Sequence, residues 1–283
     1  MNYQHWLAYA ANKICHSNSA KYDAEILLQY ITGKTRTFFI VFGRTELTVK
    51  QQQQLEHLLT RRANGEPIAY IVGKKEFWSL SIKVSSVTLI PRADTECLVE
   101  RGLQLLSKKR EVKILDLGTG TGAVALALAS ERPEAKIIGV DVSDAAIVLA
   151  QLNANNLMIN NIKFCKSNWF TSLPIQKFDM IISNPPYIDK CDPHLQEGDV
   201  RFEPKTALIS ANHGLADIQL IIKQSRNYLI NNGWLLLEHG WLQARKVRRL
   251  FSCYHYQQIV TFQDYAGNDR ITVGKWEYDE NNN

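Results

Sequence analysis

Short apolar runs alternate with helix-like segments from residue 112 onward, and this alternation limits the fold more than any other feature of the chain. Five strands are predicted at "VKILDL" (112–117), "KIIGVDV" (136–142), "IKFCKS" (162–167), "FDMIIS" (178–183) and "WLLLEH" (234–239). Helices are expected between them, at about 121–131, 143–156 and 214–231. Strands this apolar suit a parallel sheet that is covered by helices on both faces.

Two further strands are predicted near the C-terminus, at "YQQIVTF" (256–262) and "RITVGKW" (270–276). Only the short "QDYAGND" separates them, and a connection of that length joins antiparallel neighbours rather than parallel ones. The sequence therefore predicts an α/β domain whose mixed, seven-stranded sheet ends in antiparallel strands.

The first 65 or so residues have helical rather than strand periodicity. Thr48 and Gln51 fit a capping box at the start of a helix. Gly33 offers a stop to an earlier helix. That earlier helix has apolar residues spaced i, i+3, i+4 and i+7, at Ala24, Leu27, Leu28 and Ile31. A small helical domain is expected here.

A stretch with strand periodicity follows, because Trp78, Leu80, Ile82 and Val84 alternate with polar residues. Together with the preceding "AYIVG" it predicts a β-hairpin between two domains. The expected organisation is a helical domain at 1–70, a connecting hairpin at 71–88 and an α/β domain at 89–283. The helical domain has no enzymatic signature, so we assign it to substrate recognition.

The glycine-rich loop "LDLGTGTGA" (115–123) follows the first predicted strand and opens a helix. Gly118, Gly120 and Gly122 allow a tight turn and a close approach of the backbone to a ligand. With Thr119 and Thr121 between them, these glycines predict a site for a nucleotide-type cofactor.

Two cofactor classes fit this loop. Gly118, Gly120 and Ala123 match GxGxxA, and Asp141 ends the second strand where a ribose would lie, so a nicotinamide dehydrogenase remains open. Asp116 favours S-adenosylmethionine instead, because an acid beside the glycines would repel a pyrophosphate but suits an amino group. In "SNW" (167–169), Asn168 and Trp169 are expected near the adenine, the first as an acceptor and the second by stacking or packing.

The stretch "IISNPPYI" (181–188) predicts the reacting group. Two prolines end the strand and hold Asn184 in an extended loop. A planar amide or arylamine nitrogen attacks a methyl group poorly unless its N–H groups are held by acceptors. Asn184 Oδ1 and the Pro185 carbonyl supply two such acceptors, with Pro186 keeping the loop extended and Tyr187 offering a flat surface. Asn184 is also expected to make a secondary contact to the methionine part of the cofactor.

Composition places few limits on the partners. The net charge of +5 and the pI of about 8.8 are mildly basic, which permits a nucleic-acid or ribosome-associated partner but is equally common in other enzymes. No stable binding to nucleic acid is expected. The five cysteines (Cys15, Cys97, Cys165, Cys191 and Cys253) have no CxxC spacing, and the seven histidines show no metal spacing, so reduced thiols and no metal site are expected. With no signal peptide and no long apolar run, a soluble, cytoplasmic protein without membrane attachment is expected.

Taken together, "DLGTGTGA", "VDVS", "SNWF" and "SNPPYI" resemble class I, Rossmann-like methyltransferases that use S-adenosylmethionine to modify planar nitrogens. More narrowly, the chain resembles the peptide chain release factor glutamine methyltransferases. That resemblance is carried by "RRANGEPIAYIVGKKEFWSL" (61–80), "LIPRADTE" (89–96), "EPKTAL" (203–208), "LLLEHGWLQ" (235–243) and "DYAGNDR" (264–270). The chain departs from it at Ala93, usually a proline, and at Asn168, usually an aspartate.

The resemblance implies N5-methylation of a protein glutamine, the one in the GGQ motif of class I translation release factors. An adenine-N6 methyltransferase acting on DNA or RNA uses the same "NPPY" chemistry and is the alternative. It is disfavoured because the chain shows no additional region of the size that base flipping requires. A non-catalytic binding module is disfavoured by the intact Asn184 and glycine loop.

Overall fold

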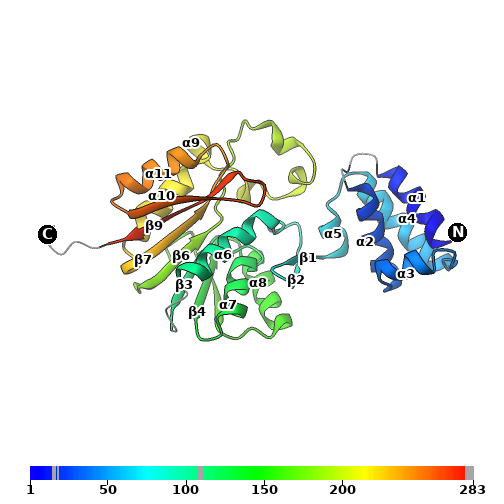
Figure 1. Ribbon diagram of the computed structural model, residues 1–283, viewed down its shortest axis with the longest axis horizontal. Coiled ribbons are helices and arrows are strands. Elements are labelled where there is room, and N and C mark those ends of the chain that lie inside the picture. Colours follow the sequence, from blue (N-terminus) through cyan, green and yellow to red (C-terminus); the bar gives the residue numbers. More distant parts are fainter. Residues whose placement is uncertain (15–16, 18, 107–110, 278–283) are drawn as a thin grey trace. The chain divides into compact units, whose positions relative to one another are not determined.

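The computed structural model describes residues 1–14, 17, 19–106 and 111–277, so Cys15 lies outside the described residues. The chain divides into two compact units (Figure 1). The first consists of Met1–Lys74 and Pro193–Phe202, and the second of Lys75–Asp192 and Glu203–Asn283. The segment Pro193–Phe202 thus packs with the N-terminal helices, although the sequence analysis placed it in the α/β domain. Among the helices of the described residues, none is long and apolar enough to cross a membrane.

The N-terminal unit is helical, as expected. Its helices are α1 (Tyr3–Lys13), α2 (Ala20–Thr32), α3 (Arg36–Val41), α4 (Val49–Ala63) and α5 (Ile68–Val72). The predicted capping box is confirmed: Thr48 and Gln51 exchange side-chain to backbone hydrogen bonds at the start of α4. Gly33 ends α2 in the left-handed region, with φ +68°. The core of the unit includes Trp6, Leu27, Leu28, Leu55 and Leu59, all fully buried.

A buried arginine joins separate parts of this unit. Arg62 Nε donates to Asp23 Oδ2 at 2.8 Å, and Arg62 Nη1 donates to Asp199 Oδ1 at 3.0 Å. Asp199 belongs to the segment between the short 3₁₀ helices η2 (Pro193–Gln196) and η3 (Val200–Phe202). Because a buried charge is costly without partners, this pairing fixes the segment against α2 and α4.

The predicted hairpin exists but begins later than expected. Its strands are β1 (Lys74–Phe77) and β2 (Leu80–Lys83), while most of "AYIVG" forms helix α5. Pro67 precedes that helix with φ −55°, and Gly73 ends it in the left-handed region. A short apolar run has no periodicity that separates strand from helix, and here the flanking proline and glycine decide.

The second unit contains the mixed, seven-stranded sheet that the sequence predicts. Its strands are β3 (Lys113–Leu117), β4 (Lys136–Asp141), β5 (Ile162–Lys166), β6 (Phe178–Ser183), β7 (Leu229–Glu238), β8 (Gln257–Gln263) and β9 (Asp269–Trp276). They lie in the order β5-β4-β3-β6-β7-β9-β8. Strands β3 to β7 are parallel, and β9 runs antiparallel to both β7 and β8.

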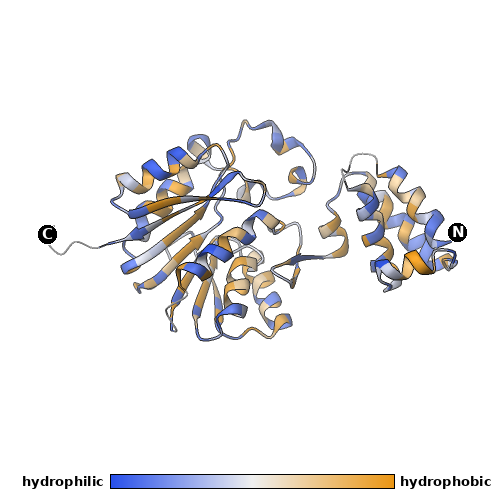
Figure 2. Cartoon of the chain, viewed as in Figure 1, coloured by the Kyte–Doolittle hydropathy of each residue, from blue (hydrophilic) through white to orange (hydrophobic). Residues whose placement is uncertain are grey.

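Helices cover both faces of this sheet. They are α6 (Glu96–Leu105), α7 (Ala123–Glu131), α8 (Asp144–Leu157), α9 (Ala211–Gly214), α10 (Ala216–Ser225) and α11 (Ala244–Cys253), with η1 (Ala93–Thr95) and η4 (Lys205–Ala207) as short 3₁₀ turns. Leu115 and Leu117 of β3 belong to one buried cluster with Ile218 of α10 and Val247 of α11. On the other face, Gly102 of α6 lies close to side chains of α7 and β6. Figure 2 shows that the strands of this sheet are mostly apolar, whereas helices such as α11 carry both polar and apolar residues.

One predicted helix is shorter than expected. The sequence predicts a helix at 214–231, but α10 ends at Ser225 and β7 begins at Leu229. The pairing of β6 with β7 shifts register between Phe178 and Met180, and Asn232 has φ +64° there. A bulge of this kind lets the polar "NNG" stretch lie within a strand.

The parallel pairing brings the loops after β3, β4 and β6 to one edge of the sheet. Leu117 is paired with Val140 of β4 and with Ser183 of β6, so these strands end level with one another. The buried Ser183 hydroxyl donates to the Leu117 carbonyl at 2.7 Å. The glycine loop and the "NPPY" stretch are therefore fixed side by side.

Asn153 of α8 provides a test of how the hairpin is attached. Its side chain accepts from Lys83 N at 2.8 Å and donates to the carbonyls of Lys83 and Thr121 at 3.0 and 2.9 Å. We expect Asn153→Ala to lower the free energy of unfolding by about 1–3 kcal/mol, since buried backbone groups lose their partners. Urea unfolding measures this loss, and hydrogen exchange should report faster exchange of the Lys83 amide.

The control is Asn155→Ala, at an exposed position two residues along the same helix. It should change stability by less than about 0.5 kcal/mol. If the two variants have equal stability and equal Lys83 exchange, the attachment of the hairpin does not depend on Asn153.

Candidate functional site

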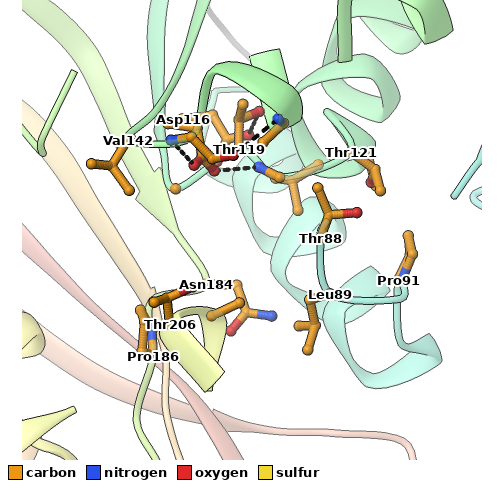
Figure 3. A pocket seen from close by; sticks show the side chains of 18 of the residues that line it. Thr88, Leu89, Pro91, Asp116, Thr119, Thr121, Val142, Asn184, Pro186 and Thr206 are labelled. Atoms are coloured by element: carbon orange, nitrogen blue, oxygen red, sulfur yellow. Dashed lines mark hydrogen bonds between the residues drawn. The ribbon is translucent and has the colours of Figure 1, made fainter. Parts of the chain in front are cut away.

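A pocket lies at the edge of the sheet where these strands end, entirely within the second unit. The glycine loop forms one side of it, and Asn184, Pro186 and Thr206 form the opposite side (Figure 3). The segment after β2 supplies another wall, with Thr88, Leu89 and Pro91. Loops from distant parts of the sequence thus meet around one cavity, as is usual where strand order reverses in an α/β sheet.

Two of the loop glycines line the pocket, and the third allows close packing behind it. Gly118 and Gly120 line the pocket with φ +69° and +55°, and an added Cβ on Gly120 would have no neighbour closer than 3.9 Å. Gly122 is not among the lining residues. A Cβ on Gly122 would meet Phe164 at 3.0 Å and Ala150 at 3.2 Å, so this glycine allows close packing of the loop. Thr119 and Thr121 both line the pocket, although each is largely buried.

Asp116 lines the pocket and is 2% exposed. Its Oδ2 accepts from the Thr119 hydroxyl at 2.6 Å. Burial raises the pKa of Asp116 to about 7, and the negative charge of Asp141 adds to this effect, while hydrogen bonds from Thr119 and the Ala125 backbone oppose it. A cationic group bound beside Asp116 would stabilise its ionised form.

Asp141 ends β4 and holds the backbone around it. Its Oδ2 accepts from Gly120 N and its Oδ1 from Ser143 N, each at 2.9 Å. Each carboxylate oxygen can accept a second hydrogen bond, so both remain able to receive ribose hydroxyls. The residue thus shapes the loop in addition to facing the pocket.

The third group of lining residues follows β5. Asn168 and Trp169 both line the pocket, and Trp169 Nε1 donates to Asp217 Oδ1 at 3.2 Å. A Cβ on Gly118 would lie 3.5 Å from the Trp169 ring, so the ring packs against the glycine loop. Asp217, at the start of α10, lines the same pocket and was not singled out from the sequence.

Asn184 faces the pocket from the end of β6. Its Nδ2 donates to Thr95 Oγ1 at 3.2 Å. This hydrogen bond directs the amide hydrogens toward Thr95 and leaves Oδ1 as the acceptor atom of the side chain. An acceptor held in this way suits a substrate N–H.

Pro186 also lines the pocket, whereas Pro185 and Tyr187 are not among its lining residues. The Tyr187 hydroxyl donates to Glu238 Oε1 at 3.2 Å, and its ring packs against the apolar cluster under α10 and α11. Burial, together with the charge of Glu238, raises the pKa of Tyr187, so the phenol stays protonated. The roles assigned to Pro185 and Tyr187 stay predictions.

Thr95, Thr206 and Glu238 are not among the site residues that the sequence predicts. A threonine in a polar loop carries no signal of its own. Glu238 does have a signal in the sequence, because it follows three leucines in a predicted strand and an acid in such a place is seldom buried without a hydrogen-bond or ionic partner. The pair of Arg92 with the buried Glu203, at 2.6 Å, was likewise visible only in three dimensions.

The charges in the pocket distinguish between the two cofactor classes. Three acids line it, Asp116, Asp141 and Asp217, and its one lining cation, Arg92, is paired with Glu203. This balance suits the ammonium group and ribose of S-adenosylmethionine and repels a pyrophosphate. In the described part of the chain, no group of three potential ligands is arranged to hold a metal ion.

Comparison with known proteins agrees with this arrangement. The family described as "Methyltransferase domain" matches residues 108–272, and the family described as "PrmC N-terminal domain" matches residues 5–73. A methyltransferase of Pyrococcus furiosus superposes with a TM-score of 0.52 at 16% identity, covering 70% of this chain and 90% of that one. This likeness shows the fold.

The curated relatives decide the family. The release factor glutamine methyltransferase of Escherichia coli K12 is 56% identical over 98% of this chain and 99% of its own length. Those of Yersinia pestis and Haemophilus influenzae are 53% and 49% identical, again over 98% of this chain and 99% of their own lengths. The chain belongs to the release factor glutamine methyltransferase family.

Membership of this family settles the choice that the glycine loop left open. The protein is a methyltransferase that uses S-adenosylmethionine, and the nicotinamide and non-catalytic alternatives are dropped. The adenine-N6 alternative is not favoured, because these relatives are named for glutamine. The predicted α/β fold is confirmed in the same way.

The raised pKa of Asp116 predicts a pH effect on stability. Because burial raises this pKa from 3.8 to about 7, the folded chain keeps the Asp116 proton at pH values where the unfolded chain has lost it. Asp116 therefore lowers stability progressively as the pH rises through this interval. As the pH rises from about 5 to about 8, we expect the free energy of unfolding of the wild type to decrease relative to that of Asp116→Asn. Urea unfolding at both values measures it, and a difference independent of pH would contradict the burial of an ionisable Asp116.

Proposed function

We propose that this protein methylates the side-chain nitrogen of a glutamine in a protein substrate, and that the substrate is the GGQ motif of a class I translation release factor. The observation that carries the proposal is the acceptor Asn184 Oδ1, placed in the same pocket as the glycine loop and its acids. Near-full-length relatives named for this reaction support it. The protein would act in the cytoplasm, where translation takes place, without stable binding to nucleic acid.

The residues that would hold the cofactor follow from the pocket. Asp116 would face the ammonium group, the backbone of Gly118 to Thr121 would lie along the methionine and ribose, and Asp141 would accept from the ribose hydroxyls. Asn168 and Trp169 would contact the adenine. Bound S-adenosylmethionine would supply a methyl group activated by its positively charged sulfur.

The chain's own residues would then orient the nucleophile. An amide nitrogen has its lone pair delocalised into the carbonyl, so it needs both N–H groups held and its lone pair aimed. Asn184 Oδ1 would accept one N–H, and the Pro185 carbonyl the other, at about 2.7–3.2 Å. Catalysis of this kind is positioning in a prearranged polar site, and it needs no base before transfer.

Mass spectrometry of a purified release factor, incubated with the enzyme and S-adenosylmethionine, tests the function. We expect a mass gain of one methyl group on the GGQ glutamine. Asn184→Ala should lower the single-turnover rate by about a hundredfold or more, the scale of losing a prearranged polar contact.

The affinity for S-adenosylmethionine serves as the internal control, since the glycine loop and Asp141 stay intact in that variant. It should fall far less than the rate. Methylation of DNA but not of a release factor would support the adenine-N6 alternative. An Asn184→Ala enzyme that binds cofactor poorly but transfers methyl normally at saturation would refute the role of Asn184.

We also propose that the N-terminal unit recognises the protein substrate. Its helix α3 and the turn after it present three exposed apolar side chains, Ile40, Val41 and Phe42, around a shallow hollow. Exposed apolar groups gathered in one place are typical of surfaces that contact another protein.

Substitution in this hollow should separate protein binding from chemistry. We expect Ile40→Lys to raise KM for the whole release factor by about tenfold, the effect of losing one well-packed contact residue. The kcat and the affinity for S-adenosylmethionine should not change. Val148→Lys, at a similarly exposed apolar position on α8, is the control. Equal KM values for the two variants would contradict a recognition role for this surface.

A further inference from the structure

Glu238 is a buried acid that has no role in the reaction as proposed above. It ends β7 after three fully buried leucines, Leu235, Leu236 and Leu237, and is itself 2% exposed. A carboxyl group in such a place costs free energy unless hydrogen bonds compensate it. Its neighbours therefore indicate what it does.

Two hydroxyl groups approach this carboxyl group. Tyr187 Oη donates to Glu238 Oε1 at 3.2 Å. Oε2 is buried and has no hydrogen-bond partner, so this oxygen is open to a donor. Burial raises the pKa of the carboxyl group, and the Thr95 hydroxyl opposes this effect. Thr95 is the residue that accepts from Asn184 Nδ2. Glu238 thus accepts from Tyr187, and its unpartnered Oε2 is the acceptor available to the hydroxyl that receives Asn184 Nδ2.

The proton on Thr95 decides how Asn184 is oriented. A hydroxyl group has one proton, and Thr95 Oγ1 can accept from Asn184 Nδ2 only if that proton points elsewhere. The Glu238 carboxylate is the acceptor toward which it can point. Without this acceptor, the Thr95 proton could be donated to Asn184 Oδ1, and the amide would turn its N–H groups toward the substrate.

The charged and hydrogen-bonding groups that act on Glu238 come from three parts of the chain. Asp94 of η1 raises the pKa of Glu238 and Arg270 of β9 lowers it, while Tyr187, after β6, donates a hydrogen bond. Arg270 is itself paired with Asp264 at 3.0 Å, so its charge is largely compensated. Burial dominates and raises the pKa of Glu238 to about 7. The carboxylate is therefore the main form only above neutral pH.

We propose that Glu238 is a positioning residue that accepts from Thr95 and Tyr187 and thereby keeps Asn184 Oδ1 directed at the substrate amide. This inference rests on the proposed function, because it describes how the same site is held ready. The Thr95 hydroxyl is available for this role, because it makes no capping hydrogen bond at the start of α6.

Glu238→Gln tests the proposal because it keeps the size of the side chain and leaves one acceptor oxygen for two hydroxyl donors. We expect kcat to fall by at least about tenfold, a modest effect for a misdirected group. The affinity for S-adenosylmethionine should not change. The wild-type kcat should fall as the pH decreases through about 7, because protonation removes the same acceptor, and Glu238→Gln should lack this step.

Thr95→Val removes the hydroxyl at nearly constant shape and provides a second test. If Glu238 acts through Thr95, the double variant should lose little more activity than Thr95→Val alone. Glu134→Gln is the matched acid-to-amide control, since Glu134 is exposed at the opposite end of the strands, before β4. Its kcat and pH profile should equal those of the wild type.

An NMR measurement that does not depend on enzymatic activity tests the positioning role separately from the proposed function. The side-chain amide resonances of Asn184 should shift in Glu238→Gln and not in Glu134→Gln, whichever substrate the enzyme uses. Wild-type kcat in Glu238→Gln, multiplicative losses in the double variant, or unshifted Asn184 resonances would each overturn the positioning role. If the wild type fails to methylate a release factor but the resonances shift, the substrate is wrong and the orientation of Asn184 stands.

Discussion

The site depends on the pairing of β3 with β6. Leu117 and Ser183 are partners in this parallel register, and the Ser183 hydroxyl donates to the Leu117 carbonyl at 2.7 Å in a fully buried position. The glycine loop begins directly after Leu117, and Asn184 directly after Ser183. A slip of one residue would turn every side chain of β6 to the other face and carry Asn184 away from the loop. The sheet therefore sets the distance between the glycine loop and Asn184.

Buried and partly buried polar groups then hold the residues in and around the pocket in place. Asp116 receives the Thr119 hydroxyl, Asp141 receives two backbone amides, and Glu238 receives Tyr187. Burial raises the pKa values of Asp116 and Glu238 to about 7, so these two carboxyl groups reduce stability as the pH rises toward neutrality. Functional sites that contain buried ionisable groups commonly stabilise a protein less than apolar side chains in the same place would. In exchange, the donors and acceptors need not rearrange when a substrate arrives.

Several residues were predictable from the sequence because their signal is local. Gly118 and Gly120 have positive φ angles that a glycine readily adopts, and the double proline after Asn184 ends a strand wherever it occurs. Gly122 carries the same signal but serves packing against Phe164, since the pattern does not reveal which side a loop glycine faces. The short "AYIVG" run was ambiguous for a related reason, because its length supports either a strand or a helical turn.

By itself, the sequence determined the alternation of strands and helices, the antiparallel end of the sheet, the glycine loop and the end of β6 before the two prolines. Each of these follows from periodicity or from a backbone preference of the residue concerned. The tertiary structure alone decided that Thr95 meets Asn184, that Asp217 holds Trp169, and that Pro193–Phe202 packs with the N-terminal helices. Those contacts join residues far apart in the chain, and no local pattern records which distant hydroxyl or carboxyl group a fold will bring within 3.2 Å.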